Sequence, residues 1–186
     1  VEQLNIVDND LAARVAAKLG LPAPAEVPVE LDLPASPALS QLNTATDTIE
    51  SRKIALLADN GVDIAAVEQF VAAMHDRGAI VEVLAPIGGG TLRGADGGEL
   101  PVDRGMTTMS SVLYDAVVVP GGTESVQSLA ADGYAVHFVT EAYKHLKPVA
   151  AQGGGRELLR AAGVFERLSD SAEVAAERGV VTTAAE

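Results

Sequence analysis

The sequence predicts an α/β fold built around a doubly wound, mostly parallel sheet. From residue 53 onward, short apolar runs of strand length alternate with segments that carry apolar residues at helical spacing. Glycine-rich turns follow several of these runs. Aromatic residues make up only 3% of the chain and Trp is absent. We therefore expect a core of closely packed Ala, Val, Leu and Ile.

The first fifty residues follow a different pattern. Residues 8–10 (Asp-Asn-Asp) can cap a short helix over residues 11–19, which Gly20 and Pro22 would end. Its apolar face would hold residues at four-residue spacing, namely Leu11, Val15 and Leu19. Residues 22–48 carry five prolines and isolated apolar residues without a sustained period. We expect an extended linker that lies along a neighbouring domain or subunit.

A βαβ unit is predicted next. Residues 53–58 form a buried-strand run, and Asp59, Asn60 and Gly61 supply a turn. A helix over residues 62–77 would end at Gly78, and residues 79–85 give a second strand. Such strands pair in parallel through a right-handed crossover.

The remaining elements continue the alternation. In the glycine-rich residues 86–109, the turn sequence Asp96-Gly97-Gly98 predicts a small β-hairpin between residues 91–92 and 99–102. Further elements are predicted in this order: strand 115–119, helix 125–130, helix 134–146, strand 148–151, a glycine turn at 153–155, helix 156–162 and strand 180–183. Because such a sheet usually finishes with a covering helix, we also expect the domain to continue beyond Glu186.

The charge and composition of the chain exclude several classes of partner and of chemistry. The formal net charge is −13, which repels phosphate backbones, so we expect no nucleic-acid partner. No apolar run approaches the length of a membrane span, and we expect no membrane partner. Without cysteine there is no thiol nucleophile and no thiolate metal site. The stretch shows no targeting segment, which favours a cytoplasmic location.

The predicted crevice lies beyond the carboxyl ends of the strands, at residues 59–63, 120–124 and 152–156. The glycines there could offer backbone N–H groups to an anion, or could only allow tight turns with positive φ. The second interpretation is favoured, since no phosphate-loop or dinucleotide spacing is present. A nucleophile elbow would fall at residues 152–155, where no side chain can attack a carbonyl.

Other chemistry-bearing residues have ordinary structural interpretations. The three histidines lack zinc-site spacing and are expected at surface or partner contacts: His75, His137 and His145. Two lysines are expected to act on the dipole at the end of a helix: Lys144 and Lys147. The three tyrosines are expected as half-buried packing residues: Tyr114, Tyr134 and Tyr143.

Several runs resemble one family, the large-subunit haem catalases. Residues 7–16 and 19–22 look like the end of the catalase domain, and residues 35–40 are similar to the segment that follows it. Residues 52–55 and the run 141–148 (EAYKHLKP) look like the extra carboxyl-terminal domain of those enzymes. The similarity extends over nearly the whole chain.

The resemblance implies a flavodoxin-like domain related to the DJ-1/PfpI and class I glutamine amidotransferase-like proteins. Active members of that group have a cysteine at the elbow. That position falls here on Gly153, and the usual neighbouring histidine falls on Gly154. The acidic partner falls near Val62, with Asp63 beside it as a vestigial acid. The resemblance therefore implies no catalytic, cofactor-binding or metal-binding residue in this chain.

The resemblance also implies two domains and a function. Residues 1–50 would be the end of the catalase core region, and residues 51–186 a flavodoxin-like domain truncated at its carboxyl end. The parent would be a haem-dependent homotetramer that decomposes hydrogen peroxide to water and oxygen. This chain would contact its catalase core and other subunits, serving assembly and stability.

The sequence leaves two alternatives to this assembly function open. One is a holdase-type chaperone that binds unfolded client proteins. The other is an independent hydrolase or glyoxalase acting through Asp63 or Glu124, which the glycine at position 153 disfavours.

Overall fold

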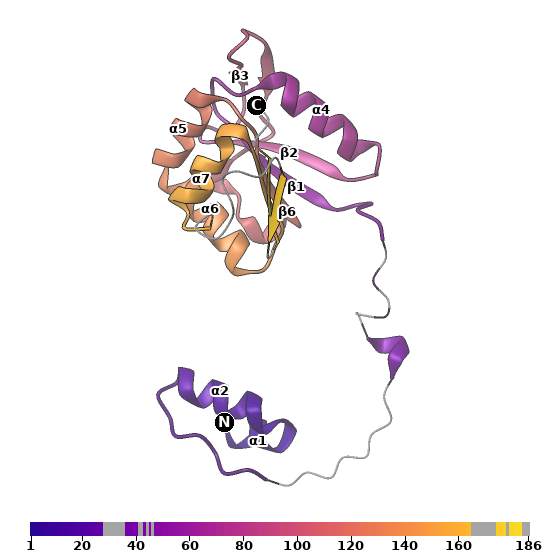
Figure 1. Ribbon diagram of the computed structural model, residues 1–186, viewed down its shortest axis with the longest axis vertical. Coiled ribbons are helices and arrows are strands. Elements are labelled where there is room, and N and C mark those ends of the chain that lie inside the picture. The colour runs from indigo at the N-terminus through magenta and orange to yellow at the C-terminus, as the bar shows by residue number, and fades with distance from the viewer. Residues whose placement is uncertain are drawn as a thin grey trace. The chain divides into compact units, whose positions relative to one another are not determined.

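A computed structural model describes residues 1–27, 36–40, 43, 45, 47–164, 174–177 and 179–183. The chain divides into two compact units, residues 1–46 and 47–186 (Figure 1). Much of the predicted linker, including residues 28–35, lies outside the described residues.

The first unit contains two short helices, α1 (Glu2–Val7) and α2 (Asn9–Lys18), and a 3-10 turn, η1 (Pro37–Leu39). Asp8 caps α2 as predicted, because its carboxylate accepts a hydrogen bond of 2.9 Å from the Leu11 amide. Helix α1 was not predicted. The side chain of Asn5 is buried and donates to the carbonyl of Ala25 at 2.6 Å, which ties the following segment to α1.

The predicted apolar face of α2 is wrong. The buried residues of this helix are Ala12 and Ala16, whereas Leu11 and Leu19 are exposed. Alanines let α2 approach its neighbours closely, so the larger side chains are left facing outward. The first unit therefore displays apolar surface instead of enclosing it.

The second unit is built on a seven-stranded sheet in the order β5-β2-β1-β6-β7-β9-β8. All neighbours are parallel except β8, which runs antiparallel to β9. The strands are β1 (Lys53–Leu57), β2 (Ile80–Ala85), β5 (Arg104–Gly105), β6 (Ala116–Val119), β7 (Val149–Gln152), β8 (Val174–Glu177) and β9 (Val180–Thr183). The predicted doubly wound, mostly parallel sheet is confirmed.

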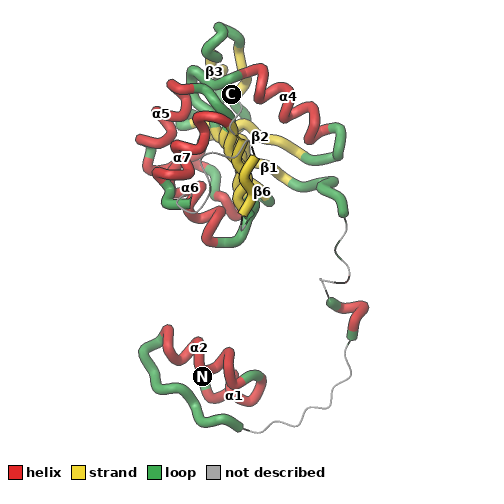
Figure 2. The backbone as a smooth tube through the Cα atoms, in the orientation of Figure 1, coloured by secondary structure: helices red, strands yellow, loops and turns green. Residues whose placement is uncertain are grey.

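Helices cover both faces of this sheet, as Figure 1 and the colours of Figure 2 show. Helix α4 (Ile64–His75) lies on one face, and α5 (Thr123–Ala131), α6 (Gly133–Lys144) and α7 (Arg156–Ala161) lie on the other. Each face of the sheet has its own hydrophobic core, and alternate residues of β1 point into one or the other. Leu56 packs on the α4 side, and Ala55 and Leu57 pack on the other. No helix in the described part of the chain has the length and apolarity to span a bilayer.

The predicted hairpin is confirmed between β2 and β5. Strand β3 (Thr91–Arg93) pairs antiparallel with β4 (Glu99–Pro101), and Gly97 in the turn has a φ of 84°. Two 3-10 turns follow, η2 (Met106–Thr108) and η3 (Ser111–Leu113). Strands β5 and β8 were not predicted, because β5 has only two residues and β8 reads Val-Ala-Ala-Glu.

Three expectations about single side chains need correction. Tyr114 is almost fully buried and Tyr134 is exposed, so only Tyr143 is the half-buried tyrosine that was predicted. Helix α6 ends at Lys144, two residues before the predicted end at Leu146, and the Leu146 side chain is 89% exposed. Lys147 lies beyond α6, and its ammonium donates to the carbonyls of Ser111, Val112 and Tyr114 instead of acting on the helix dipole.

A partly buried polar cluster lies near the β5 edge of the sheet. The carboxylate of Glu82, 14% exposed, accepts the Tyr114 hydroxyl at 2.6 Å and the Lys53 ammonium at 3.1 Å, and the Arg104 guanidinium is 3.9 Å away. The Tyr114 hydrogen bond is the largest cause that lowers the pKa of Glu82. Burial, followed by the hydrogen bond to Glu82, raises the pKa of Tyr114 far above 10. The cluster is therefore stable as a carboxylate and a neutral phenol.

We predict that Tyr114→Phe lowers the free energy of unfolding by about 1.5–3 kcal/mol at pH 7, because the hydrogen bond from the buried Tyr114 hydroxyl to the charged Glu82 carboxylate is lost. The pKa of the Glu82 carboxyl is lowered from 4.5 by folding, so Glu82 stabilises the folded state above pH 4.5. That stabilisation is lost as the pH falls through the pKa of Glu82 in the folded state. The raised pKa of Tyr114 gives stability that is lost above pH 10. The difference between wild type and variant in urea unfolding should therefore shrink below about pH 4.5 and above pH 10. Tyr143→Phe is the matched control and should change little; a pH-independent difference would contradict the assignment.

Candidate functional site

The three predicted crevice loops meet at the carboxyl edge of the sheet. The Asp63 amide donates to the Gly121 carbonyl at 3.1 Å, which joins the loops after β1 and β6. A Cβ atom on Gly155 would overlap the carbonyl oxygens of Val119 and Pro120, so the loops after β6 and β7 are also in backbone contact. The main chains of the three loops therefore pack closely together at the edge where such folds bind ligands.

Gly153 lies at the sharp bend after β7, where the elbow was predicted. Its φ is 49°, in the left-handed region, and the residue is buried. The Arg156 side chain closes the turn by donating to the Gly153 carbonyl at 3.2 Å. Gly154 follows and is exposed. The backbone has the bend of an elbow, but neither residue offers a nucleophile or a base.

The acidic positions have structural partners. Val62 is fully buried in the apolar core on the α4 side. The carboxylate of Asp63 accepts a hydrogen bond of 3.0 Å from the Ala66 amide and so caps α4. Glu124 is exposed in the first turn of α5. Among the described residues, no hydrogen bond joins either carboxylate to Gly153.

The β3–β4 hairpin is fastened over the loop that follows β1. The Gly61 amide donates to the Arg93 carbonyl at 2.7 Å, and the Arg93 amide donates to the side-chain oxygen of Asn60 at 2.9 Å. The same region borders a cavity of about 470 Å³, whose lining includes Arg93, Thr123 and Glu124. The sequence predicts only a turn at Asn60, because nothing in it indicates which strand the Asn60 side chain would bind.

Asp59 links the same loop to α5. One carboxylate oxygen accepts the Ser128 hydroxyl at 2.5 Å and the other accepts the Asn60 amide at 2.8 Å. The Asp59 amide in turn donates to the Ser125 hydroxyl at 2.8 Å. These bonds hold the loop after β1 against α5.

The histidines stay apart from the crevice loops in sequence and in the fold. His75 lies in the last turn of α4, and His137 and His145 are exposed on α6. The His145 Nε2 atom is 3.5 Å from a carboxylate oxygen of Glu141. Within the described residues, no group of three or more ligating side chains is arranged to hold a metal ion.

Comparison with known proteins gives concordant results. The family model for the C-terminal domain found in long catalases matches residues 50–186. The chain is 60% identical to Catalase HPII of Mycobacterium avium over 185 residues, covering 100% of this chain and 26% of that protein. It is 45% identical to Catalase HPII of Pseudomonas putida over 150 residues, covering 78% of this chain and 21% of that protein. The chain thus spans about a quarter of the length of these relatives.

Solved structures share the fold at low identity. An oxidized DJ-1 of Toxoplasma gondii has a TM-score of 0.66 at 14% identity, covering 72% of this chain and 82% of that one. A ThiJ/PfpI domain protein of Brachyspira murdochii also has a TM-score of 0.66, at 19% identity, covering 72% and 87%. The flavodoxin-like, DJ-1/PfpI-type architecture is therefore shown.

We predict that Gly155→Ala destabilises the chain by about 1–3 kcal/mol, because its new methyl group would overlap backbone oxygens that cannot move independently. The matched control is Gly154→Ala, where the nearest atom to a new Cβ is Val126 Cγ2 at 4.0 Å. That change should be neutral or stabilise by up to about 1 kcal/mol. Urea unfolding of both variants measures the contrast, and equal losses would refute the packing described here.

Proposed function

The chain belongs to the family of C-terminal domains found in long catalases, and from this premise we propose that it is a non-catalytic module serving the assembly and stability of a longer haem catalase. The longer protein would decompose hydrogen peroxide to water and oxygen. This chain would contribute contacts to the catalase core and to other subunits of a homotetramer.

The observation that carries the proposal is Gly153. The fold of the DJ-1/PfpI relatives is retained, and the bend after β7 has a positive φ, yet the residue at the bend has no side chain. Covalent acyl or carbonyl chemistry needs a nucleophile with a base in reach. Gly153 and Gly154 supply neither, and Asp63 caps α4.

The tyrosines do not fit a haem site. In catalases the haem iron takes a tyrosine oxygen as its protein ligand. The hydroxyl of Tyr114 donates to Glu82, and burial raises its pKa, which keeps the phenol neutral. Tyr134 and Tyr143 lie on α6, exposed and half-buried. The haem of the longer protein would accordingly be held outside this chain.

Exposed apolar side chains in the first unit support a contact role. Helices α1 and α2 and the segment after them present several large apolar residues to solvent: Ile6, Val7, Leu11, Leu19, Leu21 and Val27. Clusters of this kind mark surfaces that a partner covers. The unit is too small to bury them itself, so the catalase core of the longer protein is the natural partner.

We expect a long catalase truncated before Ser51 to lose tetramer stability while keeping its turnover per haem. Removing the second unit would take away its contacts and leave the haem pocket intact. Thermal inactivation and light-scattering mass as a function of temperature measure the effect, and the dissociation midpoint should fall by several degrees. An unchanged midpoint would remove the assembly and stability role.

The isolated chain tests the two alternatives. A holdase draws support from the same exposed apolar residues, and a hydrolase or glyoxalase would need Asp63 or Glu124 to act. We expect the chain, at molar excess, neither to suppress heat aggregation of a client enzyme nor to turn over glyoxals or small amides. Suppression by the wild type would favour the chaperone. Turnover abolished by Asp63→Asn or Glu124→Gln would favour the enzyme.

A further inference from the structure

Asn60 is the only asparagine of this sequence that is followed by glycine. Asparagine side chains are chemically labile, and a following glycine favours attack on them because it has no Cβ to hinder the approach of its amide nitrogen. Asn60 is exposed and Gly61 is buried, in the loop that follows β1. The chemistry of this pair therefore depends on how the loop is held.

The reaction would join the two residues in a ring. The Gly61 nitrogen forms a bond to the Asn60 side-chain carbon Cγ, and the bond from Cγ to Nδ2 breaks. Ammonia leaves with the proton that the Gly61 amide gives up, and a cyclic imide (succinimide) remains. Water then opens the ring at either carbonyl, which leaves an aspartate or an isoaspartate in place of Asn60. Water is the only co-reactant that these steps consume.

The β3–β4 hairpin holds both reacting groups. The Gly61 amide donates to the Arg93 carbonyl at 2.7 Å, so its nitrogen keeps its proton and its orientation. The Arg93 amide donates to Asn60 Oδ1 at 2.9 Å, which fixes the side-chain amide that would be attacked. The Val62 amide also closes a turn onto the Asp59 carbonyl at 3.2 Å, with Gly61 at a φ of 84°. Ring closure requires rotation about the Asn60 bonds, so these hydrogen bonds must open first.

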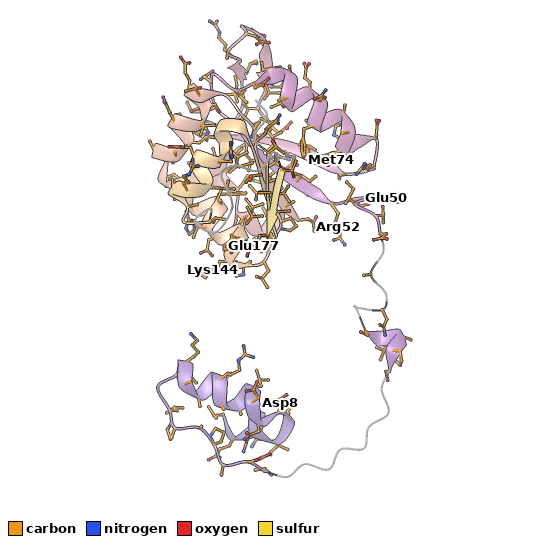
Figure 3. All side chains as sticks on the ribbon, viewed as in Figure 1. Asp8, Glu50, Arg52, Met74, Lys144 and Glu177 are labelled. Atoms are coloured by element: carbon orange, nitrogen blue, oxygen red, sulfur yellow. The ribbon has the colours of Figure 1, made fainter. Side chains whose placement is uncertain are left out.

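Few buried side chains hold the hairpin on the domain. Leu92 and Leu100 are buried, and both lie in the apolar core on the α4 side. A Cβ on Gly94 would overlap the side chain of Ile64, so the hairpin also packs on the first residue of α4. Figure 3 labels Met74, near the opposite end of this helix. Because small elements with few buried contacts open at a lower free energy than the whole fold, the hairpin should open locally.

Isoaspartate would disturb the close packing at this edge of the sheet. It inserts an extra backbone carbon before Gly61, whose carbonyl lies where Gly122 has no room for a side chain. A Cβ on Gly61 would in turn overlap Glu124, so Gly61 has little space to shift toward α5. The product also adds a carboxylate beside that of Asp59, which accepts the Ser128 hydroxyl. The contact between the loops after β1 and β6 would therefore loosen.

We propose that Asn60 is a deamidation site that the β3–β4 hairpin keeps closed. Opening of the hairpin frees Asn60 and Gly61 to react, and the aspartate and isoaspartate products remain after the hairpin has closed again. The conversion is irreversible and weakens the loop contacts, so the stability of the domain falls as converted chains accumulate. This site needs no partner and is independent of the proposed assembly role.

The test follows conversion of Asn60 in mildly alkaline buffer by peptide mass spectrometry, which detects the replacement of an NH group by oxygen. The folded wild type should convert at least about tenfold more slowly than the chain in urea. Leu92→Ala should speed conversion in the folded chain by about tenfold or more, because a buried hairpin side chain is lost. The matched control is Leu158→Ala, a buried leucine of α7 in the other core, which should change the rate by less than about threefold.

The rates decide whether the hairpin protects the site. Equal conversion in the folded wild type and in urea would overturn the proposal. Equal acceleration by Leu92→Ala and Leu158→Ala would also overturn it, because global unfolding would then be the route. If Leu92→Ala does not fold, Leu92→Val removes one methylene and should still speed conversion by about threefold; a rate equal to that of the wild type would count against the hairpin.

Melting of the products tests the effect on loop packing. The isoaspartate form, separated from the aspartate form, should melt at a lower temperature than Asn60→Asp, because only isoaspartate lengthens the backbone before Gly61. Equal melting temperatures of the isoaspartate form, Asn60→Asp and the wild type would show that conversion leaves the loop contacts intact, and would overturn the claim that it weakens the domain.

Discussion

The fold depends on close backbone packing at the carboxyl edge of the sheet. A Cβ on Gly122 would overlap the Gly61 carbonyl and Val62, and one on Gly155 would overlap carbonyls after β6. Glycine is required at both points because no side chain fits. The same packing brings the three loops together at the edge where folds of this class bind ligands, beside the cavity that Gly61 and Glu124 border.

The sequence predicts the layers well because their signals are local. Apolar runs such as residues 53–58 predict buried strands, and Gly78 and Gly97 do adopt the positive φ that their turns require. Burial of single side chains depends on partners far away along the chain, and there the predictions fail. Tyr114 is buried because Glu82, 32 residues earlier, accepts its hydroxyl. No periodicity contains that information.

The candidate site shows the same contrast between local features, which the sequence reveals, and long-range partners, which it does not. The glycines at the elbow are visible in the sequence, whereas the N-cap role of Asp63 is not, because the predicted helix began at Val62 and α4 begins at Ile64. The roles of Asn60 and Asp59 are not visible, since each is defined by a partner on another element, the β3–β4 hairpin for Asn60 and α5 for Asp59. A polar residue in a loop can be identified as turn-forming without any indication of which loop it binds.

The run 141–148 illustrates how far internal packing accounts for a family-like sequence. Ala142 is buried, Tyr143 packs against the core, Glu141 pairs with Lys144, and Lys147 clamps η3. Leu146 is different, because its side chain is 89% exposed among the described residues and glycine would suit its backbone better. A strained, exposed leucine between two well-bonded neighbours is costly in the isolated domain. The hydrogen bonds of the Leu146 and Lys147 amides to the end of α6 hold the backbone in this conformation, so the fold accounts for the backbone of Leu146 and not for its side chain.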